Sequence, residues 1–182
     1  MKTANLRQGN VSYPAVININ NKKLKQEINM KICETAYQGI PDTYIGDNII
    51  EANSSYEATY NQNSILSLKF QNYSYIKGAA HGITIQKSIT LNLTNADIYN
   101  FDDLFKNNAD YKTRIDKIIQ RQIVQRNSAM LSQFKGITPD EEYYLTDNYL
   151  IIYYQIYEYT PYYYGILEFK IPYMSISDLL VI

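Results

Sequence analysis

The chain has 182 residues, of which 46% are hydrophobic and 19% charged, and its formal net charge at pH 7 is −1. A chain of this length buries roughly 70% of the surface of its unfolded form, so its core needs neither metals nor disulfides, and the single cysteine, Cys33, excludes an internal disulfide. The thinly spread basic residues argue against a nucleic-acid partner, and no run reaches the ~18 apolar residues that cross a bilayer. We expect a soluble protein, either cytoplasmic or held at a membrane only through an anchor absent from this chain.

Twenty tyrosines and no tryptophan are the oddity of the composition. Tyrosine is common on half-buried strands, which is one explanation. An aromatic binding face is the other, because tyrosine is enriched at interfaces. The composition alone leaves both explanations open.

The first third of the chain predicts a strand and then a helix. Residues 11–19 alternate loosely, and Pro14 favours an edge strand. Asn20 or Asn21 is expected to cap a helix that runs to about Tyr37. Its apolar stripe consists of Leu24, Ile28, Ile32 and either Thr35 or Ala36.

Three antiparallel strands are predicted next, at residues 56–60, 64–75 and 83–93. Residues 61–63 have the composition of a hairpin turn between the first two. Each of the last two strands alternates apolar and polar residues, so we expect one buried face and one wet face. Residues 73–82, which are small and flexible in the middle, predict a bent or bulged crossing between paired strands.

The last part of the chain predicts a helical turn, a long helix, three strands and a short helix. The turn is expected at residues 101–105, and the long helix from a cap at Asn107 or Asn108 to near Met130. The strands are expected at residues 142–145, 149–157 and 166–171, and the closing short helix at residues 173–180.

This order of elements defines the fold class as α+β, a mainly antiparallel sheet with two longer helices packed on it and a short C-terminal helix. Boundaries near residues 53–64 or 100 are conceivable, but neither region has the composition of a linker. We therefore expect one unit over residues 1–182, in which an N-terminal segment (1–60) and a C-terminal segment (61–182) share a core.

Catalytic machinery is sparse. His81 is the only histidine, and no local motif pairs it with Cys33. The acidic clusters, Asp102 with Asp103 and residues 140–142, have no metal-ligand spacing, and no phosphate-binding glycine loop is present. We predict no enzyme, no cofactor and no metal. His81 is then either structural, with a ring nitrogen bonded to a backbone carbonyl, or part of a ligand surface.

Several motifs resemble one known family. The sequence YSYIKGAAHG at residues 73–82 resembles the Y-x-Y-x-G-G-A-H-G signature of the extracytoplasmic domain of the anti-sigma factor RsiV, a domain that also stands beside the catalytic domain of the peptidoglycan deacetylase PdaC. Further family motifs are matched in order by LFK at 104–106, YLTDN at 144–148, YEYTPY at 157–162 and the ending from Gly165 to Pro172 and Tyr173. The sequence departs from the family at Ala79, Thr160 and Tyr164.

The resemblance implies a function in sensing or binding. The chain is similar to the outer domain of RsiV, a membrane-anchored receptor whose outer domain binds lysozyme. This resemblance implies an extracytoplasmic, non-enzymatic domain with a lysozyme-like protein partner. The alternative is an accessory domain that binds peptidoglycan, with tyrosines stacking on sugars. A third alternative, hydrolysis of wall material, requires paired carboxylates facing one cleft. The candidate partner-binding residues are Pro161, Tyr162, Tyr163, Tyr164, Tyr159, Tyr75 and His81.

Overall fold

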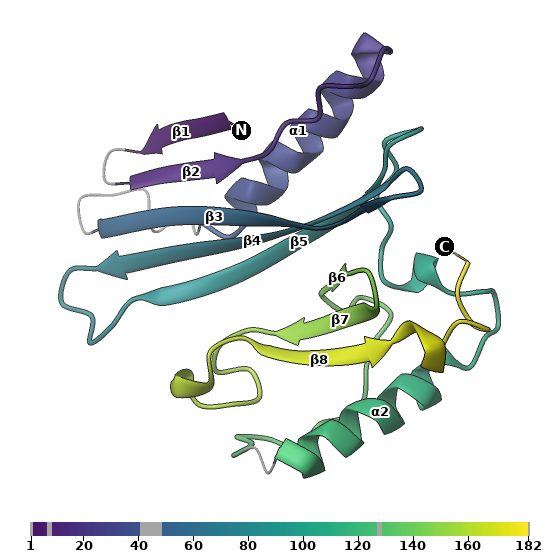
Figure 1. Ribbon diagram of the computed structural model, residues 1–182. Coiled ribbons are helices and arrows are strands. Elements are labelled where there is room, and N and C mark those ends of the chain that lie inside the picture. Colours follow the sequence, from purple (N-terminus) through teal and green to yellow (C-terminus); the bar gives the residue numbers. More distant parts are fainter. Residues whose placement is uncertain (1, 7–8, 41–48, 127–128, 182) are drawn as a thin grey trace. The chain divides into compact units, whose positions relative to one another are not determined.

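The computed structural model describes residues 2–6, 9–40, 49–126 and 129–181. The chain forms two compact units, Met1–Ile98 and Tyr99–Ile182, each with its own sheet (Figure 1). The sheets are mostly antiparallel and are accompanied by two α-helices, which confirms the α+β class. The core predicted to be shared over the whole chain stays a prediction.

The first unit is a five-stranded sheet with one helix, α1 (Lys22–Gln38), packed on it (Figure 1). All neighbouring strands pair antiparallel except β2 and β3, which pair in parallel. The strands follow the chain in order across the sheet: β1 (Lys2–Leu6), β2 (Gly9–Tyr13), β3 (Ile49–Gln62), β4 (Ile65–Ile76) and β5 (Ile83–Asn92).

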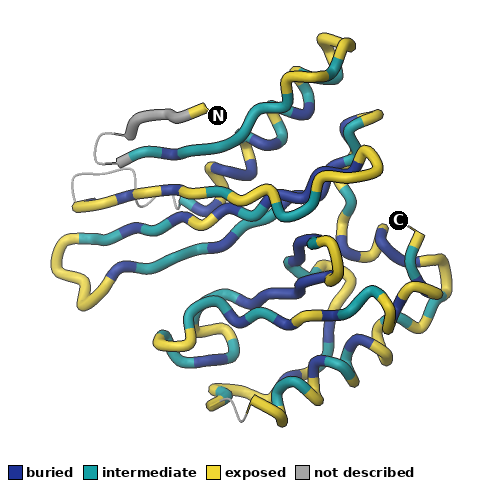
Figure 2. The backbone as a smooth tube through the Cα atoms, in the orientation of Figure 1, coloured by how far each residue is buried: buried dark blue, intermediate teal, exposed yellow. Residues whose placement is uncertain are grey.

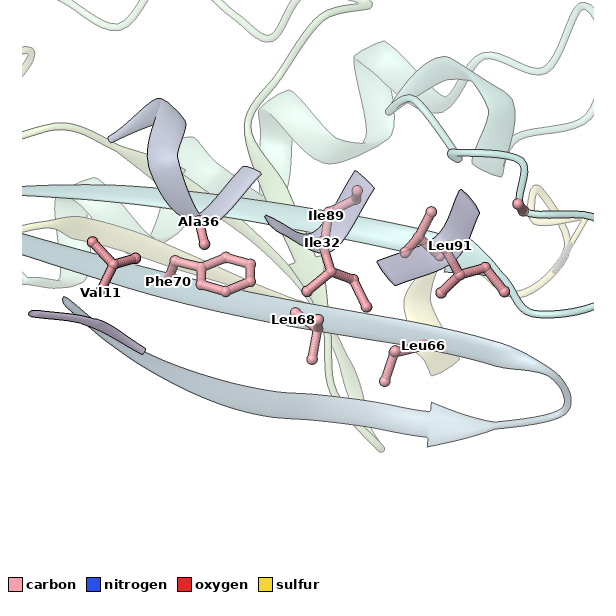
Figure 3. Close-up of a cluster of buried hydrophobic side chains, with 10 residues drawn as sticks. Val11, Ile32, Ala36, Leu66, Leu68, Phe70, Ile89 and Leu91 are labelled. Carbon is pink, nitrogen blue, oxygen red and sulfur yellow. The ribbon is translucent and has the colours of Figure 1, made fainter. Parts of the chain in front are cut away.

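The amphipathic pattern of α1 builds the core of this unit. Asn21 is the N-cap, as predicted, and its side chain accepts a hydrogen bond from the Leu24 amide at 3.1 Å. The predicted stripe is confirmed, since its buried members face the sheet. Figure 3 shows the resulting cluster, which joins α1 to strands β2, β4 and β5 through Val11, Ile28, Ile32, Ala36, Leu66, Leu68, Phe70, Ile89, Leu91 and Ala96.

The second strand, β2, ends at Tyr13, well before the predicted end at Ile19. Pro14 has no amide hydrogen to donate to a sheet. Beyond it, the side chain of Asn29 takes over the backbone hydrogen bonds of Val16, accepting from its amide at 2.7 Å and donating to its carbonyl at 2.9 Å. An amide side chain of α1 thus replaces a neighbouring strand.

Strands β3 to β5 form the predicted meander with two differences. β3 is longer than the predicted residues 56–60, and it absorbs two register shifts, between Ile49 and Glu51 and between Ala58 and Tyr60. The second face of the sheet is not wet throughout, because Ser67, Gln86 and Thr90 are buried. The hydroxyls of Ser67 and Thr90 lie 3.0 Å apart across the strands and satisfy each other, which makes burial of these polar groups tolerable.

The second unit is a three-stranded antiparallel sheet with helix α2 (Tyr111–Arg126) along strand β8 (Figure 1). The strands are β6 (Tyr143–Leu145), β7 (Tyr149–Tyr154) and β8 (Leu167–Pro172). Ile115 and Ile119 are the fully buried residues of the α2 stripe. The predicted turn at residues 101–105 is confirmed as a 3₁₀ turn, Asp102–Leu104. In the described part of the chain, neither α-helix has the length and the apolar composition to cross a membrane.

Both ends of α2 differ from the prediction. Asp110, and not Asn107 or Asn108, accepts a hydrogen bond from the Thr113 amide, at 3.2 Å. Asn108 has a positive φ of 61° and belongs to the preceding turn. At the other end α2 reaches Arg126, so that Met130 lies outside the helix.

The predicted C-terminal helix is wrong, since only the 3₁₀ turn Tyr173–Ser175 forms there. The cause is a non-local pairing of the chain end with the segment around Phe105. The Lys106 amide donates to the Leu179 carbonyl at 2.8 Å, and the Val181 amide to the Leu104 carbonyl at 2.9 Å. These bonds hold the chain end extended, and Phe105 and Leu180 form a β-bridge.

Candidate functional site

The connection between β7 and β8 presents four tyrosine rings in two pairs. Tyr163 is 75% exposed and its ring centroid lies 4.8 Å from that of Tyr164. Tyr157 is 50% exposed and lies 5.8 Å from Tyr162. The interplanar angle between the two rings is similar in both pairs, 35° for Tyr163 and Tyr164 and 36° for Tyr157 and Tyr162. This set, residues 157–164, is called the tyrosine loop below; it offers broad aromatic surface of the kind that binding proteins use as anchors.

The shape of the tyrosine loop comes from two turns. The Glu158 carboxylate accepts a hydrogen bond from the Gln155 amide at 2.8 Å, and the Glu158 amide donates to the Gln155 carbonyl at 3.1 Å. After Pro161, whose φ is −58°, the chain makes the 3₁₀ turn Tyr162–Tyr164. Gly165 then adopts φ 69° and ψ −150°, a conformation that is essentially restricted to glycine, and returns the chain to β8.

The base of the loop is packed and hydrogen-bonded. The ring of Tyr159 lies 4.8 Å from that of Tyr154 and 6.0 Å from that of Phe134. Its carbonyl accepts a hydrogen bond from the Leu131 amide at 2.8 Å, and the hydroxyl of Tyr164 accepts one from the Ala129 amide at 3.0 Å. A loop fixed in this way loses little further conformational freedom when a partner binds.

Carboxylates surround the phenols at this base. Burial raises the pKa of the Tyr154 hydroxyl far above its ordinary value, and the negative charge of Glu141 raises it further. Burial, with Glu158 and Glu141, also raises the pKa of Tyr159. Both phenols therefore keep their protons to a higher pH than a free tyrosine does. The second unit as a whole carries eleven acidic and eight basic residues, a net charge of −3.

The predicted residues Tyr75 and His81 lie in the first unit, at the connection of β4 to β5. Residues 73–82 form this hairpin end and not the predicted bulged crossing, because β4 and β5 pair up to Ser74 and Ile83. The Tyr75 hydroxyl donates to the Ala79 carbonyl at 3.2 Å, and the ring nitrogen Nδ1 of His81 lies 3.0 Å from the Gly82 carbonyl oxygen. This carbonyl contact agrees with the structural role considered for His81.

Glycines explain the rest of the hairpin. Gly78 has φ 85°, whereas Ala79 is not in the left-handed region, which is why alanine is tolerated where the family pattern has a second glycine. The ring of Tyr73 lies against Gly82 and occupies the space that a Cβ at this position would need. The glycines of this motif thus serve the shape of the turn.

The seven predicted binding residues therefore fall into two groups, each described within its own unit. Five lie in the tyrosine loop and two in the hairpin of the first unit, and their contact with a partner stays a prediction. The sequence reasoning missed Tyr157. The sequence signal for Tyr157 is its place in the stretch YEYTPYYY, directly before Glu158. The Glu158 carboxylate accepts a hydrogen bond from the Gln155 amide, and the turn closed in this way leaves Tyr157 exposed.

The acidic clusters have local structural partners. Asp102 accepts a hydrogen bond from the Tyr111 hydroxyl at 2.6 Å, and Asp103 accepts two from Asn100, at 2.8 and 2.9 Å. Glu141 accepts from Thr138, and Glu142 from the Gln155 side chain. Among the described residues, no group of three or more potential ligands is arranged to hold a metal ion.

Two family models match the chain, one in each unit. The model described as "Deacetylase PdaC" matches residues 2–84, and "Protein of unknown function (DUF3298)" matches residues 102–174. Two crystal structures share the fold. A DUF3298 family protein from Pseudomonas aeruginosa PAO1 has a TM-score of 0.61 and 14% identity, and the match covers 84% of this chain and 69% of that one. A member of the DUF3298 family from Bacteroides fragilis NCTC 9343 has a TM-score of 0.55 and 20% identity, and the match covers 87% of this chain and 64% of that one. The first unit thus resembles the PdaC family model and the second the DUF3298 family model, and the solved structures share the fold.

Two proteins of Bacillus subtilis (strain 168) are similar in sequence. Anti-sigma-V factor RsiV is 26% identical over 94% of this chain and 65% of its own length. Peptidoglycan-N-acetylmuramic acid deacetylase PdaC is 24% identical over 71% of this chain and 29% of its own length, and the match does not cover its catalytic part. This chain spans less than two thirds of either relative. The two family models and the two relatives together support a domain family related to RsiV and PdaC.

Proposed function

We propose that this chain is a non-enzymatic sensing or binding domain of the bacterial cell envelope that recognises a lysozyme-like protein. Its relative RsiV is named for opposing a sigma factor, an activity of binding and not of catalysis, and PdaC is named for chemistry on peptidoglycan, an envelope polymer. The name of PdaC supports an extracytoplasmic location at the cell surface, with any membrane attachment outside this chain.

The observation that carries the proposal is the tyrosine loop. It combines four tyrosine rings, three of them more than a third exposed, with a base that is packed and hydrogen-bonded. Exposed tyrosines on a preorganised loop supply contact area at a low entropic cost. The net charge of −3 on the same unit favours a basic partner, which lysozymes are.

A calorimetric titration with hen egg-white lysozyme tests the proposal. We expect the Pro161→Ala/Tyr163→Ala variant to bind about tenfold more weakly or worse, which corresponds to ~1.4 kcal/mol. Tyr37→Ala is the matched control, because Tyr37 is 36% exposed but lies on α1 of the first unit. Equal affinity of the double variant and the wild type would remove the tyrosine loop from the proposal, and no binding by the wild type would remove lysozyme.

The alternative partner is peptidoglycan itself. The name of PdaC supports it, and tilted tyrosine pairs are suitable platforms for stacking on sugar rings. A pull-down on purified peptidoglycan, with the same two variants, separates the alternatives. Retention on peptidoglycan that depends on Tyr163, without affinity for lysozyme, would favour the glycan.

A further inference from the structure

A second exposed apolar surface lies on the outer side of α2. Val124 is 79% exposed and Leu131 is 56% exposed. With Ile123, Met130 and Phe134 they line an open groove of about 610 Å³ between the last turns of α2 and residues 130–134. Gln120, Ser132 and Gln133 complete its walls with groups that can hydrogen-bond to a peptide backbone. Exposed apolar side chains that gather in a polar-rimmed hollow mark an interaction site.

The two walls of this α2 groove are fixed by the rest of the unit. On the helix side, Gln122 and Arg126 tie α2 to β8 through the carbonyls of Lys170 and Glu168, each at 2.8 Å. On the other side, the Leu131 amide is bonded to the Tyr159 carbonyl, and the Phe134 ring packs among aromatic rings. The groove is therefore already formed before any partner arrives.

Two cations stand at the rim of the α2 groove. Lys117 and Arg121, one helical turn apart, share a shallow hollow with Gln120 and Val124, which also line the groove. Neither has a carboxylate within salt-bridge distance among the described residues. The other cations of α2 are engaged: Lys112 with Asp116, Arg114 with Asp178 and Arg126 with the carbonyl of Glu168.

We propose that the α2 groove binds an acidic peptide segment that carries a large apolar side chain. The apolar side chain lies between Val124 and Leu131, and carboxylates pair with Lys117 and Arg121. Complementary charge argues for an acidic occupant. The concave shape, with backbone-bonding groups on its walls, argues for a peptide over a membrane surface, to which two cations contribute only weak attraction. The proposed ligand differs from that of the tyrosine loop, although Leu131 and Phe134 of the groove wall also contact Tyr159 at the base of that loop.

Fluorescence polarisation with a labelled glutamate–leucine peptide tests this assignment on the full chain. We expect binding that weakens about tenfold in Lys117→Glu/Arg121→Glu, since ~1.4 kcal/mol corresponds to a factor of ten. We expect a similar weakening in Leu131→Ser. The matched control is Lys22→Glu/Lys23→Glu, which changes the net charge equally on an exposed part of α1 and should leave the affinity unchanged.

Three outcomes would overturn the assignment. The first is the absence of any saturable binding of the glutamate–leucine peptide. The second is equal binding of a lysine–leucine peptide, which would make the charge irrelevant. The third is sedimentation of the protein with phosphatidylglycerol vesicles that depends on Lys117 and Arg121, without binding of the peptide. This result would assign the two cations to a membrane surface.

Discussion

At the scale of single residues, the family-like motif at residues 73–82 is explained by the shape of a hairpin end. Tyr73 packs on Gly82, Tyr75 holds the Ala79 carbonyl, and Gly78 supplies the positive φ. His81 contacts a neighbouring carbonyl and needs no catalytic partner for that role. The motif therefore accounts for local structure first, and ligand contact by Tyr75 or His81 is an additional proposal.

Gly82→Ala should lower the free energy of unfolding by roughly 1–3 kcal/mol, because the new Cβ must displace the ring of Tyr73. Urea denaturation monitored by circular dichroism measures the change. In a Tyr73→Ala background the same substitution should cost much less. An equal cost in both backgrounds would show that the ring is not the obstacle.

Tyr111 should make stability depend on pH in the alkaline range. Burial and the hydrogen bond to Asp102 raise its pKa to about 12, from an ordinary value of 10. The folded state thus holds the phenolic proton more tightly, so this contribution is complete below pH 10 and is lost as pH rises from 10 to 12. Tyr111→Phe keeps the ring that stacks on Phe105 but removes the proton, so its urea midpoint should fall less over this window. An identical fall in both proteins would contradict the assignment.

At the scale of elements, α2 protects the edge of the second sheet with side chains. The Gln122 amide group donates to the Lys170 carbonyl at 2.8 Å and accepts from the Lys170 amide at 3.3 Å, as a neighbouring strand would. Arg126 covers the next outward carbonyl, that of Glu168. Unprotected edge strands invite pairing with other chains.

Gln122→Ala should therefore lower the free energy of unfolding by about 1 kcal/mol and favour self-association, because two hydrogen bonds are lost and the β8 edge is opened. Thermal denaturation and light scattering measure the two effects. Gln125→Ala, at an exposed position on the same helix, is the control for helix propensity. A monomeric Gln122→Ala protein of unchanged stability would refute the protective role.

The elements that the sequence predicted well are those with local causes. Helix α1 follows from the Asn21 cap and the spacing of Ile28 and Ile32, both visible within one stretch of chain. The C-terminal helix failed because residues 179–181 pair with residues 104–106, a partnership without local signal. Likewise, the tyrosine loop was predictable from its composition. Its ring pairs, the exposure of Tyr157 and the contacts with residues 129–134 depend on tertiary structure, which the composition does not show.

At the scale of the whole molecule, charge and aromatic surface are distributed unevenly. Residues 1–98 carry nine basic and seven acidic residues, whereas residues 99–182 have a net charge of −3 and hold the tyrosine loop. Exposed residues lie at many connections of both units and also along β3 and the helices (Figure 2). The net negative charge of residues 99–182 is the charge on which the proposal of a basic partner for the tyrosine loop rests.

Hydrogen exchange with and without hen egg-white lysozyme, read by mass spectrometry over the full chain, tests this account most directly. We predict that lysozyme slows exchange in the tyrosine loop, residues 157–164, and leaves the hairpin end at residues 77–82 unchanged. Slowed exchange at residues 77–82 with an unaffected tyrosine loop would contradict the assignment of the site. Unchanged exchange throughout the chain at saturating lysozyme would contradict the proposed partner.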